Sequence, residues 1–253
     1  MYEYQITFLV NNADRSVQLA SALPPIVKKF KSTIHLINIT QDRSGNLSKA
    51  LGVFKAGMVE GDLCQITAIG VDAELACFVI KDLVADLYTV IGTDIYSVLS
   101  QHVKTPLPFK DIHFDYAKAQ TILTKFECLK GIAQLIYPKN PDELLLAFIK
   151  REETSSTCVT PGIALPHVMF KESHQLSIAA ISTEDAIDWQ SPIGKTHLAI
   201  GLVMPDKPTK AQIIAVTNLT RNLLNHTLCE RLLLTRNSSE LQSIIMYATS
   251  RLI

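Results

Sequence analysis

The chain has 253 residues, of which 24 are basic and 24 acidic, and its formal net charge is +0. Its hydrophobic content of 47% is enough to bury a core and too high for an intrinsically disordered chain. The absence of a block of like charge argues against nucleic-acid binding, and the absence of a long apolar run argues against insertion into a membrane. The five scattered cysteines form no C-x-x-C pair, so we expect reduced thiols and a cytoplasmic protein.

The first elements predicted along the chain are those of a small α/β unit. Residues 6–10 form a strand candidate that ends in a polar, turn-like cluster. An apolar spacing typical of a helix follows, but it contains Pro24 and Pro25, which predict that this helix starts late or is broken there. Residues 32–40 are rich in β-branched side chains and predict a second strand, and residues 41–46 predict a turn.

The same unit continues with three further elements. Residues 48–55 predict a short helix that ends at Gly57. Apolar and polar residues alternate over 63–69, which is typical of a half-buried strand. Asp72 is placed to cap a final helix whose apolar residues share one face.

A change of pattern divides the chain in two. Residues 92–113 are irregular and proline-containing, so we interpret them as a linker between a domain at 1–91 and a domain at 114–253. The second domain is predicted to be a mixed α/β unit that ends in helices. Its predicted helices are 127–136, 142–151, 211–224, 228–234 and 239–248, and its predicted strands are 176–181 and 197–204.

The segment 151–167 carries the chemistry. A helix ends at Arg151, a hydroxyl-rich loop with Ser156 and Thr157 follows, and a Gly-Ile-Ala-Leu-Pro segment leads to His167. A neutral imidazole is a competent phosphoryl nucleophile, and arginine and hydroxyl groups stabilise the charge of a phosphoryl group in transit. Each feature also has a simpler interpretation: Arg151 suits a helix end as a cation, and the two hydroxyls suit an ordinary turn.

This segment, R-E-x-x-x-S-T-(x)4-G-I-A-L-P-H, resembles the signature of the fructose–mannitol type of phosphotransferase enzyme IIA, which includes the nitrogen-regulatory IIA proteins. The resemblance extends over 114–253 and includes D-A-I-D-W at 185–189. It implies a mixed β-sheet flanked by helices. It also implies a phosphohistidine at His167, with Arg151 as its partner in catalysis and Ser156 and Thr157 as phosphoryl ligands. The implied donor is an HPr-type phosphocarrier, and the implied acceptor is a IIB domain or a regulatory target.

The N-terminal domain resembles HPr itself, through the strand that leads into N-N-A-D and through the segment F-K-A-G-M-V-E-G-D. That resemblance implies an open-faced β-sandwich with helices on one face. The active segment of HPr, G-L-H-x-R-P, falls on residues 13–18, where Arg15 occupies the histidine position. We therefore expect this domain to carry no phosphoryl group of its own.

Two hypotheses follow for the whole chain. In the first, a IIA domain passes the phosphoryl group from HPr to a IIB domain for sugar uptake. In the second, the IIA-like domain regulates partners according to its phosphorylation state, and the HPr-like half is a docking module. Many sugar-transporting relatives carry a second histidine where this chain has Gln212. We assign Gln212 as a further phosphoryl contact. Neither motif nor spacing predicts a cofactor or a metal site.

Overall fold

The computed structural model describes residues 3–93, 112–119, 123–235 and 238–250. The chain divides into two compact units. The first comprises Met1–Pro106 together with Thr235–Tyr247 and Ile253, and the second comprises Leu107–Leu234 together with Ala248–Leu252. The helix at the end of the chain, which the sequence places in the second domain, therefore clusters largely with the first unit.

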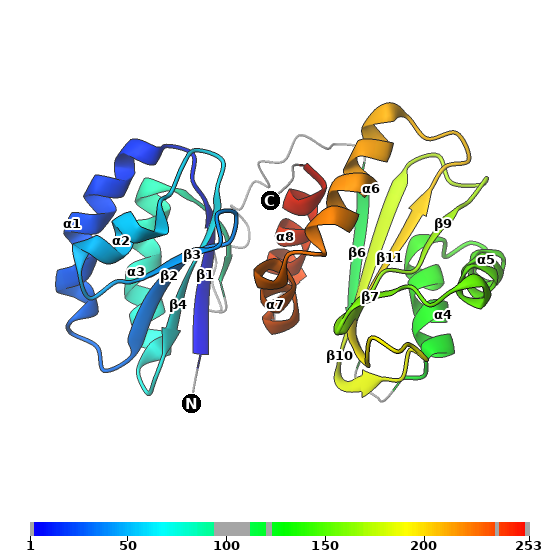
Figure 1. The fold of residues 1–253 in the computed structure, drawn as a ribbon, viewed down its shortest axis with the longest axis horizontal. Helices are drawn as coiled ribbons and strands as arrows, with labels where there is room; N and C mark the ends of the chain where they lie inside the picture. Colours follow the sequence, from blue (N-terminus) through cyan, green and yellow to red (C-terminus); the bar gives the residue numbers. More distant parts are fainter. Residues whose placement is uncertain (1–2, 94–111, 120–122, 236–237, 251–253) are drawn as a thin grey trace. The chain divides into compact units, whose positions relative to one another are not determined.

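The first unit is a five-stranded antiparallel sheet with helices packed on one face (Figure 1). Its strand order is β3-β2-β4-β1-β5. Buried residues of the helices and of the central strands form one apolar core, which confirms the α/β arrangement expected here. The strands are β1 (Glu3–Leu9), β2 (Thr33–Asn38), β3 (Arg43–Asn46), β4 (Leu63–Ile69) and β5 (Thr89–Thr93), and the helices are α1 (Ser16–Val27), α2 (Ala50–Ala56) and α3 (Ala73–Leu87).

The helix α1 runs without a break through Pro24 and Pro25, so the predicted late start or break is wrong. Both prolines lie near the C-terminal end of the helix, and each lacks the N–H that would donate to the carbonyl four residues earlier. Leu19, Leu23 and Val27 are buried on the inner face of α1. Their burial favours the helix and opposes the cost of the missing bonds, since each buried aliphatic side chain contributes about 1.5–3 kcal/mol.

Two predictions for the connections of this unit also need correction. The segment predicted as a turn contains the strand β3, which pairs antiparallel with β2 as the edge strand of a hairpin. Asp72 stands at the N-cap of α3 but forms no capping bond. Its carboxylate instead accepts hydrogen bonds from the backbone N–H groups of Lys31 and Ser32, both at 2.8 Å, and these bonds lower the pKa of Asp72. The predicted helix end at Gly57 is confirmed, with φ 58°.

The face of the sheet opposite to α1 and α3 is covered by α8 (Ser238–Ser250) in the part of this helix that belongs to the first unit. Gln65 donates a hydrogen bond of 2.9 Å from Nε2 to the Glu240 carboxylate, and the Thr7 hydroxyl donates to the same carboxylate. The Tyr247 hydroxyl donates to the Gly61 carbonyl at 2.6 Å. The strand β4 is consequently buried on both faces rather than half-buried as predicted.

The second unit contains a mixed sheet with the strand order β6-β10-β11-β8-β7, and β9 pairs with β11 (Figure 1). The pairs β10–β6 and β11–β8 are parallel, whereas β10–β11 is antiparallel, which confirms the mixed sheet. Its strands are β6 (Ile112–Lys118), β7 (Cys158–Thr160), β8 (Gly162–Ala164), β9 (His167–Met169), β10 (Leu176–Ile187) and β11 (Thr196–Met204), and its helices are α4 (Lys125–Ile136), α5 (Pro141–Thr154), α6 (Lys210–Asn222) and α7 (His226–Leu234).

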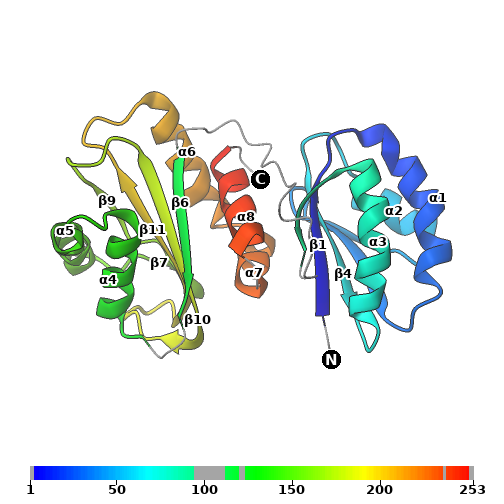
Figure 2. The ribbon, with the colours of Figure 1, turned by 180° about the vertical axis from the view of Figure 1, so that it is seen from behind.

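The helices α4 and α5 cover one face of this sheet, as Figure 2 shows from behind. Buried residues of both helices pack with β10 and β11 around Trp189. Most of the predicted linker, residues 94–111, lies outside the described residues, while β6 begins at Ile112 within the predicted linker. In the described part of the chain, no helix is both long and apolar enough to cross a membrane.

Candidate functional site

His167 is the first residue of β9 and is held by its neighbours on β11. It pairs with Leu202 in the parallel register of β9 and β11, and the Leu202 N–H donates to the Pro166 carbonyl at 2.8 Å. The approach to this segment requires glycine at Gly162, whose φ is 90° and whose missing Cβ would lie 2.8 Å from the Leu233 side chain. The backbone of His167 is thus fixed before any partner arrives.

Two contacts define the tautomer of His167. Its Nδ1 lies 2.9 Å from the Leu165 carbonyl oxygen, which can only accept, so Nδ1 carries the proton. Its Nε2 lies 3.4 Å from Nε and 3.3 Å from Nη2 of Arg151, which can only donate, so Nε2 holds a lone pair. The ring is half-buried. A neutral imidazole with its lone pair on Nε2 is the form that acts as a nucleophile.

Arg151 lies in the last turn of α5 and reaches His167 with one edge of its guanidinium group. Its Nη1 donates to the Ser155 carbonyl at 3.0 Å and to the Ser155 hydroxyl at 3.2 Å. The guanidinium group is therefore anchored at one corner and faces the nucleophile at the other. The structure brings together the two residues that the sequence assigned to catalysis.

The two hydroxyl residues of the loop differ in their surroundings. The Ser156 hydroxyl oxygen accepts a hydrogen bond from the Cys158 N–H at 3.3 Å, and its side chain is partly exposed. Thr157 is only 3% exposed, and its hydroxyl donates to the Glu152 carboxylate. Of the two, only Ser156 has a partly exposed side chain, and the roles of both hydroxyls at a phosphoryl group stay predictions.

Gln212 lies in the first turn of α6, where it closes a capping box with Thr209. Its side-chain oxygen accepts from the Thr209 N–H at 2.8 Å, and its own N–H donates to the Thr209 hydroxyl at 3.3 Å. Among the described residues, no hydrogen bond joins Gln212 to His167. Its placement at the phosphoryl group stays a prediction.

Sequence reasoning missed a group of side chains beneath the site. Glu152 and Trp189 both contact the Thr157 hydroxyl, and Lys125 pairs with Glu152 at 2.6 Å. Two of these residues lie in segments on which the family resemblance rests: Glu152 directly follows Arg151, and Trp189 ends the D-A-I-D-W segment. The contacts of Lys125 and Trp189 were not foreseeable from spacing, because both residues lie tens of positions from Glu152 and Thr157.

Arg15 lies at the N-cap of α1 in the first unit. Its Nη1 donates to the carbonyls of Asp86 and Leu87 at 3.2 and 2.9 Å, at the end of α3. The last turn of α3 contains no basic residue of its own, so Arg15 supplies the cation that the carbonyl end of the helix favours. Val17, at the position of the arginine in the HPr segment, is 61% exposed.

Thiol and metal chemistry have little support in the described residues. Burial raises the pKa of Cys128 to about 12 and that of Cys229 to about 11, so both thiols stay protonated near neutral pH. Cys158, next to the hydroxyl residues, is 4% exposed. Within the described ranges, no three metal-ligating side chains come together.

Comparison with protein families gives one match in each half of the chain. Residues 116–247 match the family described as "Phosphoenolpyruvate-dependent sugar phosphotransferase system, EIIA 2". Residues 7–86 match the family described as "PTS HPr component phosphorylation site". The first match includes α4 to α7, most of α8, and the site residues from Lys125 to Gln212.

The chain is also similar to curated proteins and to solved structures. The chain is 31% identical over 110 residues to a "Nitrogen regulatory protein" of Klebsiella oxytoca and 30% identical over 111 residues to one of Escherichia coli. These alignments cover 41% and 42% of this chain and 65% and 66% of the relatives, so the chain spans just under two thirds of their length. A nitrogen regulatory protein IIA-Ntr from Neisseria meningitidis is 20% identical, covers 52% of this chain with 92% of its own, and gives a TM-score of 0.46.

Proposed function

Because the EIIA 2 match covers just over half of its residues, the chain belongs to that family, and we propose that it is a phosphoryl carrier whose His167 takes and gives the phosphoryl group. The tautomer of His167 carries this proposal. Both ring contacts, at Nδ1 and at Nε2, leave the lone pair on Nε2, beside the guanidinium group of Arg151. A nucleophile and a cationic hydrogen-bond donor at one point suit phosphoryl transfer.

In the proposed step, one N–P bond forms as another breaks, and no proton is transferred between the two histidines. The Nε2 lone pair attacks the phosphorus of a phosphohistidine donor whose other ring nitrogen is protonated. The donor N–P bond breaks, its electron pair stays on the donor nitrogen, and the donor leaves as a neutral imidazole. The proton on Nδ1 stays in its hydrogen bond to the Leu165 carbonyl. Arg151 then donates to the phosphoryl oxygens in place of Nε2, and such a preorganised charge is worth most where negative charge develops. In the same proposal, the partly exposed Ser156 hydroxyl adds a further donor.

The proposed partners follow from the two family matches. An HPr-type phosphocarrier is the donor, because the residue that would make the first unit a donor is Arg15, whose side chain is not a phosphoryl nucleophile. The acceptor for sugar uptake is a IIB domain. Regulation by phosphorylation state is the second candidate, and a specific observation favours it: the curated relatives are themselves described as nitrogen regulatory proteins.

The decisive experiment is phosphorylation of the purified full-length protein. The protein is mixed with labelled phosphoenolpyruvate, enzyme I and HPr, and acid-labile, alkali-stable label is counted. We expect about one phosphoryl group per chain in the wild type and in Arg15→Ala, and none in His167→Ala. Label that persists in His167→Ala would contradict the assignment. Adding a IIB domain to the labelled protein then separates the two candidates, since rapid transfer supports sugar uptake and retention of the label supports regulation.

A further inference from the structure

A closed ring of polar contacts lies beneath the proposed site. The Lys125 ammonium group donates to the Glu152 carboxylate at 2.6 Å, and the Thr157 hydroxyl donates to the other oxygen of that carboxylate. The Trp189 indole N–H donates to the Thr157 hydroxyl oxygen at 3.4 Å. The ring closes where Lys125 donates to the Trp189 carbonyl at 3.4 Å, with its ammonium group 5.7 Å from the centre of the indole. We call these four residues the Glu152 ring.

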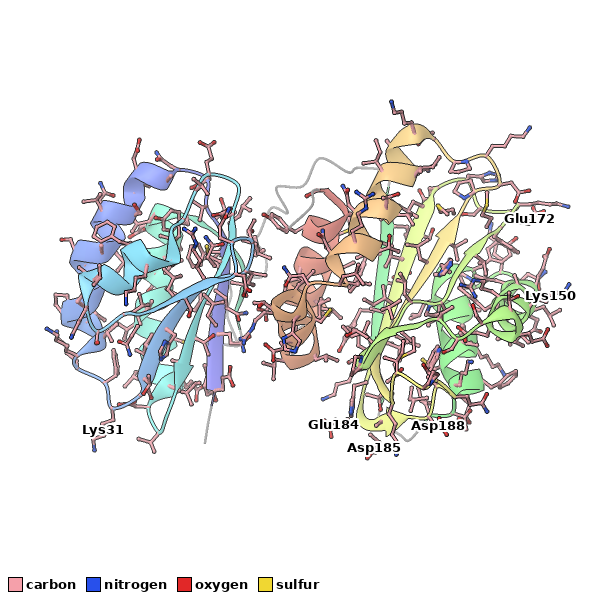
Figure 3. The ribbon with its side chains drawn as sticks, in the orientation of Figure 1. Lys31, Lys150, Glu172, Glu184, Asp185 and Asp188 are labelled. Carbon is pink, nitrogen blue, oxygen red and sulfur yellow. The ribbon has the colours of Figure 1, made fainter. Side chains whose placement is uncertain are left out.

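The burial of this ring shows that it is not an ordinary surface ion pair. The side chains of Lys125 and Glu152 are 18% and 5% exposed. Removing two charges from water costs several kcal/mol per ion, so a buried pair is weak evidence for stability and calls for another role. The pair of Lys118 and Glu184 is the opposite case in the same unit, because it has a similar separation of 2.8 Å but exposures of 55% and 81%. In Figure 3, Glu184 projects outward at the edge of β10.

The ring is connected to both partners of the site. Glu152 directly follows Arg151 on α5, and it also holds the backbone N–H of Thr157, at 3.4 Å. The Thr157 carbonyl in turn accepts from the Leu165 N–H at 2.9 Å. Leu165 is the residue whose own carbonyl orients the ring of His167. A single carboxylate thus fixes the helix end that carries Arg151 and the segment that orients His167.

We propose that Glu152, held by Lys125, is a positioning residue for phosphoryl transfer: it sets the guanidinium group of Arg151 against Nε2 of His167. This inference rests on the proposed function. It assigns no contact with the phosphoryl group to Glu152 itself, since Thr157 and Lys125 occupy its oxygens. A misplacement of about 1 Å at a reacting centre can cost about a hundredfold in rate. We therefore expect Glu152→Gln to accept phosphate roughly 10- to 100-fold more slowly than the wild type.

The test is single-turnover phosphorylation by pre-phosphorylated HPr, with the donor varied in concentration. Glu152→Gln should lower the maximal rate and leave the half-saturating concentration of HPr within about twofold, because the ring lies beneath the surface that a donor meets. Glu184→Gln removes the same charge from the exposed pair and is the matched control, with an expected rate equal to that of the wild type. A loss of rate in the control equal to that in Glu152→Gln would overturn the inference.

A double-mutant cycle separates positioning from general damage to the fold. If Glu152 acts through Arg151, Glu152→Gln should cost less than about twofold in an Arg151→Ala background, although it costs 10- to 100-fold alone. Additive losses would mean that Glu152 acts independently, and would overturn the inference. Lys125→Met combined with Glu152→Gln removes both buried charges, so this variant should fold even if a single one does not, and it should be equally slow. If this double variant is as fast as the wild type, the inference is also overturned.

The same experiment distinguishes failure of the inference from failure of the proposed function. A wild-type protein that takes no label from HPr contradicts the proposed function, and the inference falls with it. A wild type that is labelled normally, with Glu152→Gln labelled at the same rate, overturns the inference alone and leaves His167 as the proposed carrier.

Discussion

The two units use the residue at their phosphocarrier position in opposite ways. In the second unit, a carbonyl and a guanidinium group hold the ring of His167 so that one nitrogen keeps its lone pair. In the first unit, Arg15 donates to two carbonyls at the end of α3. His167 presents a nitrogen lone pair, which can accept a hydrogen bond or attack phosphorus. Arg15 has only hydrogen-bond donors, and they cap the end of a helix. If His167 is the phosphoryl carrier that we propose, the HPr-like unit has kept its fold while the residue at its histidine position serves a helix end instead.

The comparison also shows what a nucleophile needs besides its own side chain. His167 has Arg151 within 3.4 Å, and the guanidinium group is anchored by Ser155. In the first unit, Val17 stands where the HPr segment has the arginine that would be the corresponding partner of position 15. If this contrast is real, the phosphoryl group should depend on His167 and Arg151, and Arg15 should affect only stability.

The largest effect is expected when a histidine is introduced at position 15 and His167 is removed. We expect Arg15→His, in a His167→Ala background, to accept phosphate from enzyme I at least 100- to 1,000-fold more slowly than the wild type accepts it from HPr, because a missing donor in a transfer site costs roughly that factor. Adding Val17→Arg should recover part of the rate. The measurement is acid-labile label against time. Label in Arg15→His at the wild-type rate would break the comparison, since position 15 would then be a complete site without a partner.

A loss of similar size is expected from Arg151. We expect Arg151→Ala to slow phosphorylation of His167 by roughly 100- to 1,000-fold, equivalent to about 2.7–4 kcal/mol of transition-state stabilisation. Arg151→Lys should recover little, because a compact ammonium group does not reproduce the planar fork that faces phosphate oxygens. Lys150→Ala, next to it on the exposed side of α5, is the matched control and should keep the wild-type rate. Transfer by Arg151→Ala at the wild-type rate would reduce Arg151 to a helix-end cation.

Helices and strands with a regular spacing of apolar residues were predictable from the sequence. Strand β4 was predicted at 63–69 and observed at Leu63–Ile69, and α4 to α8 lie where apolar periodicity placed them. The strands β7, β8 and β9 were not predicted, because three residues are too few to show an alternating pattern. His167 therefore lies on a strand that the sequence did not predict.

The site was predictable only as far as its motif reaches. Arg151 and His167 belong to one continuous motif, and the structure places them together. The Glu152 ring was not predictable, because Lys125 and Trp189 lie outside that motif and their contact depends on the packing of α4 against the sheet. The buried far face of β4 has the same cause, since the helix that covers it comes from the other end of the chain.

A smaller effect is expected at the helix end that Arg15 caps. Arg15→Ala removes a charge-assisted donor from the carbonyls at the end of α3, so we expect the free energy of unfolding of the first unit to fall by about 1 kcal/mol. Arg15→Lys should retain part of that stability. Phosphorylation of His167 should stay within about twofold of the wild type. Urea denaturation followed by circular dichroism gives the stability, and unchanged stability in Arg15→Ala would mean that the cap contributes nothing measurable.

The smallest expected effect concerns Gln212, and it decides between a structural and a chemical interpretation of this residue. Gln212→Ala removes the side-chain half of the capping box on α6, so we expect a loss of about 0.5–1 kcal/mol in the stability of the second unit. Gln212→Glu is the matched variant, because glutamate also fits the third position of a capping box. If capping is the whole role, Gln212→Glu keeps the stability, and both variants accept phosphate at the wild-type rate. If Gln212 instead contacts the phosphoryl group, Gln212→Ala should slow acceptance by about tenfold, and Gln212→Glu should slow it further, since a carboxylate repels the phosphoryl oxygens. Single-turnover phosphorylation beside thermal unfolding of the three proteins separates these outcomes.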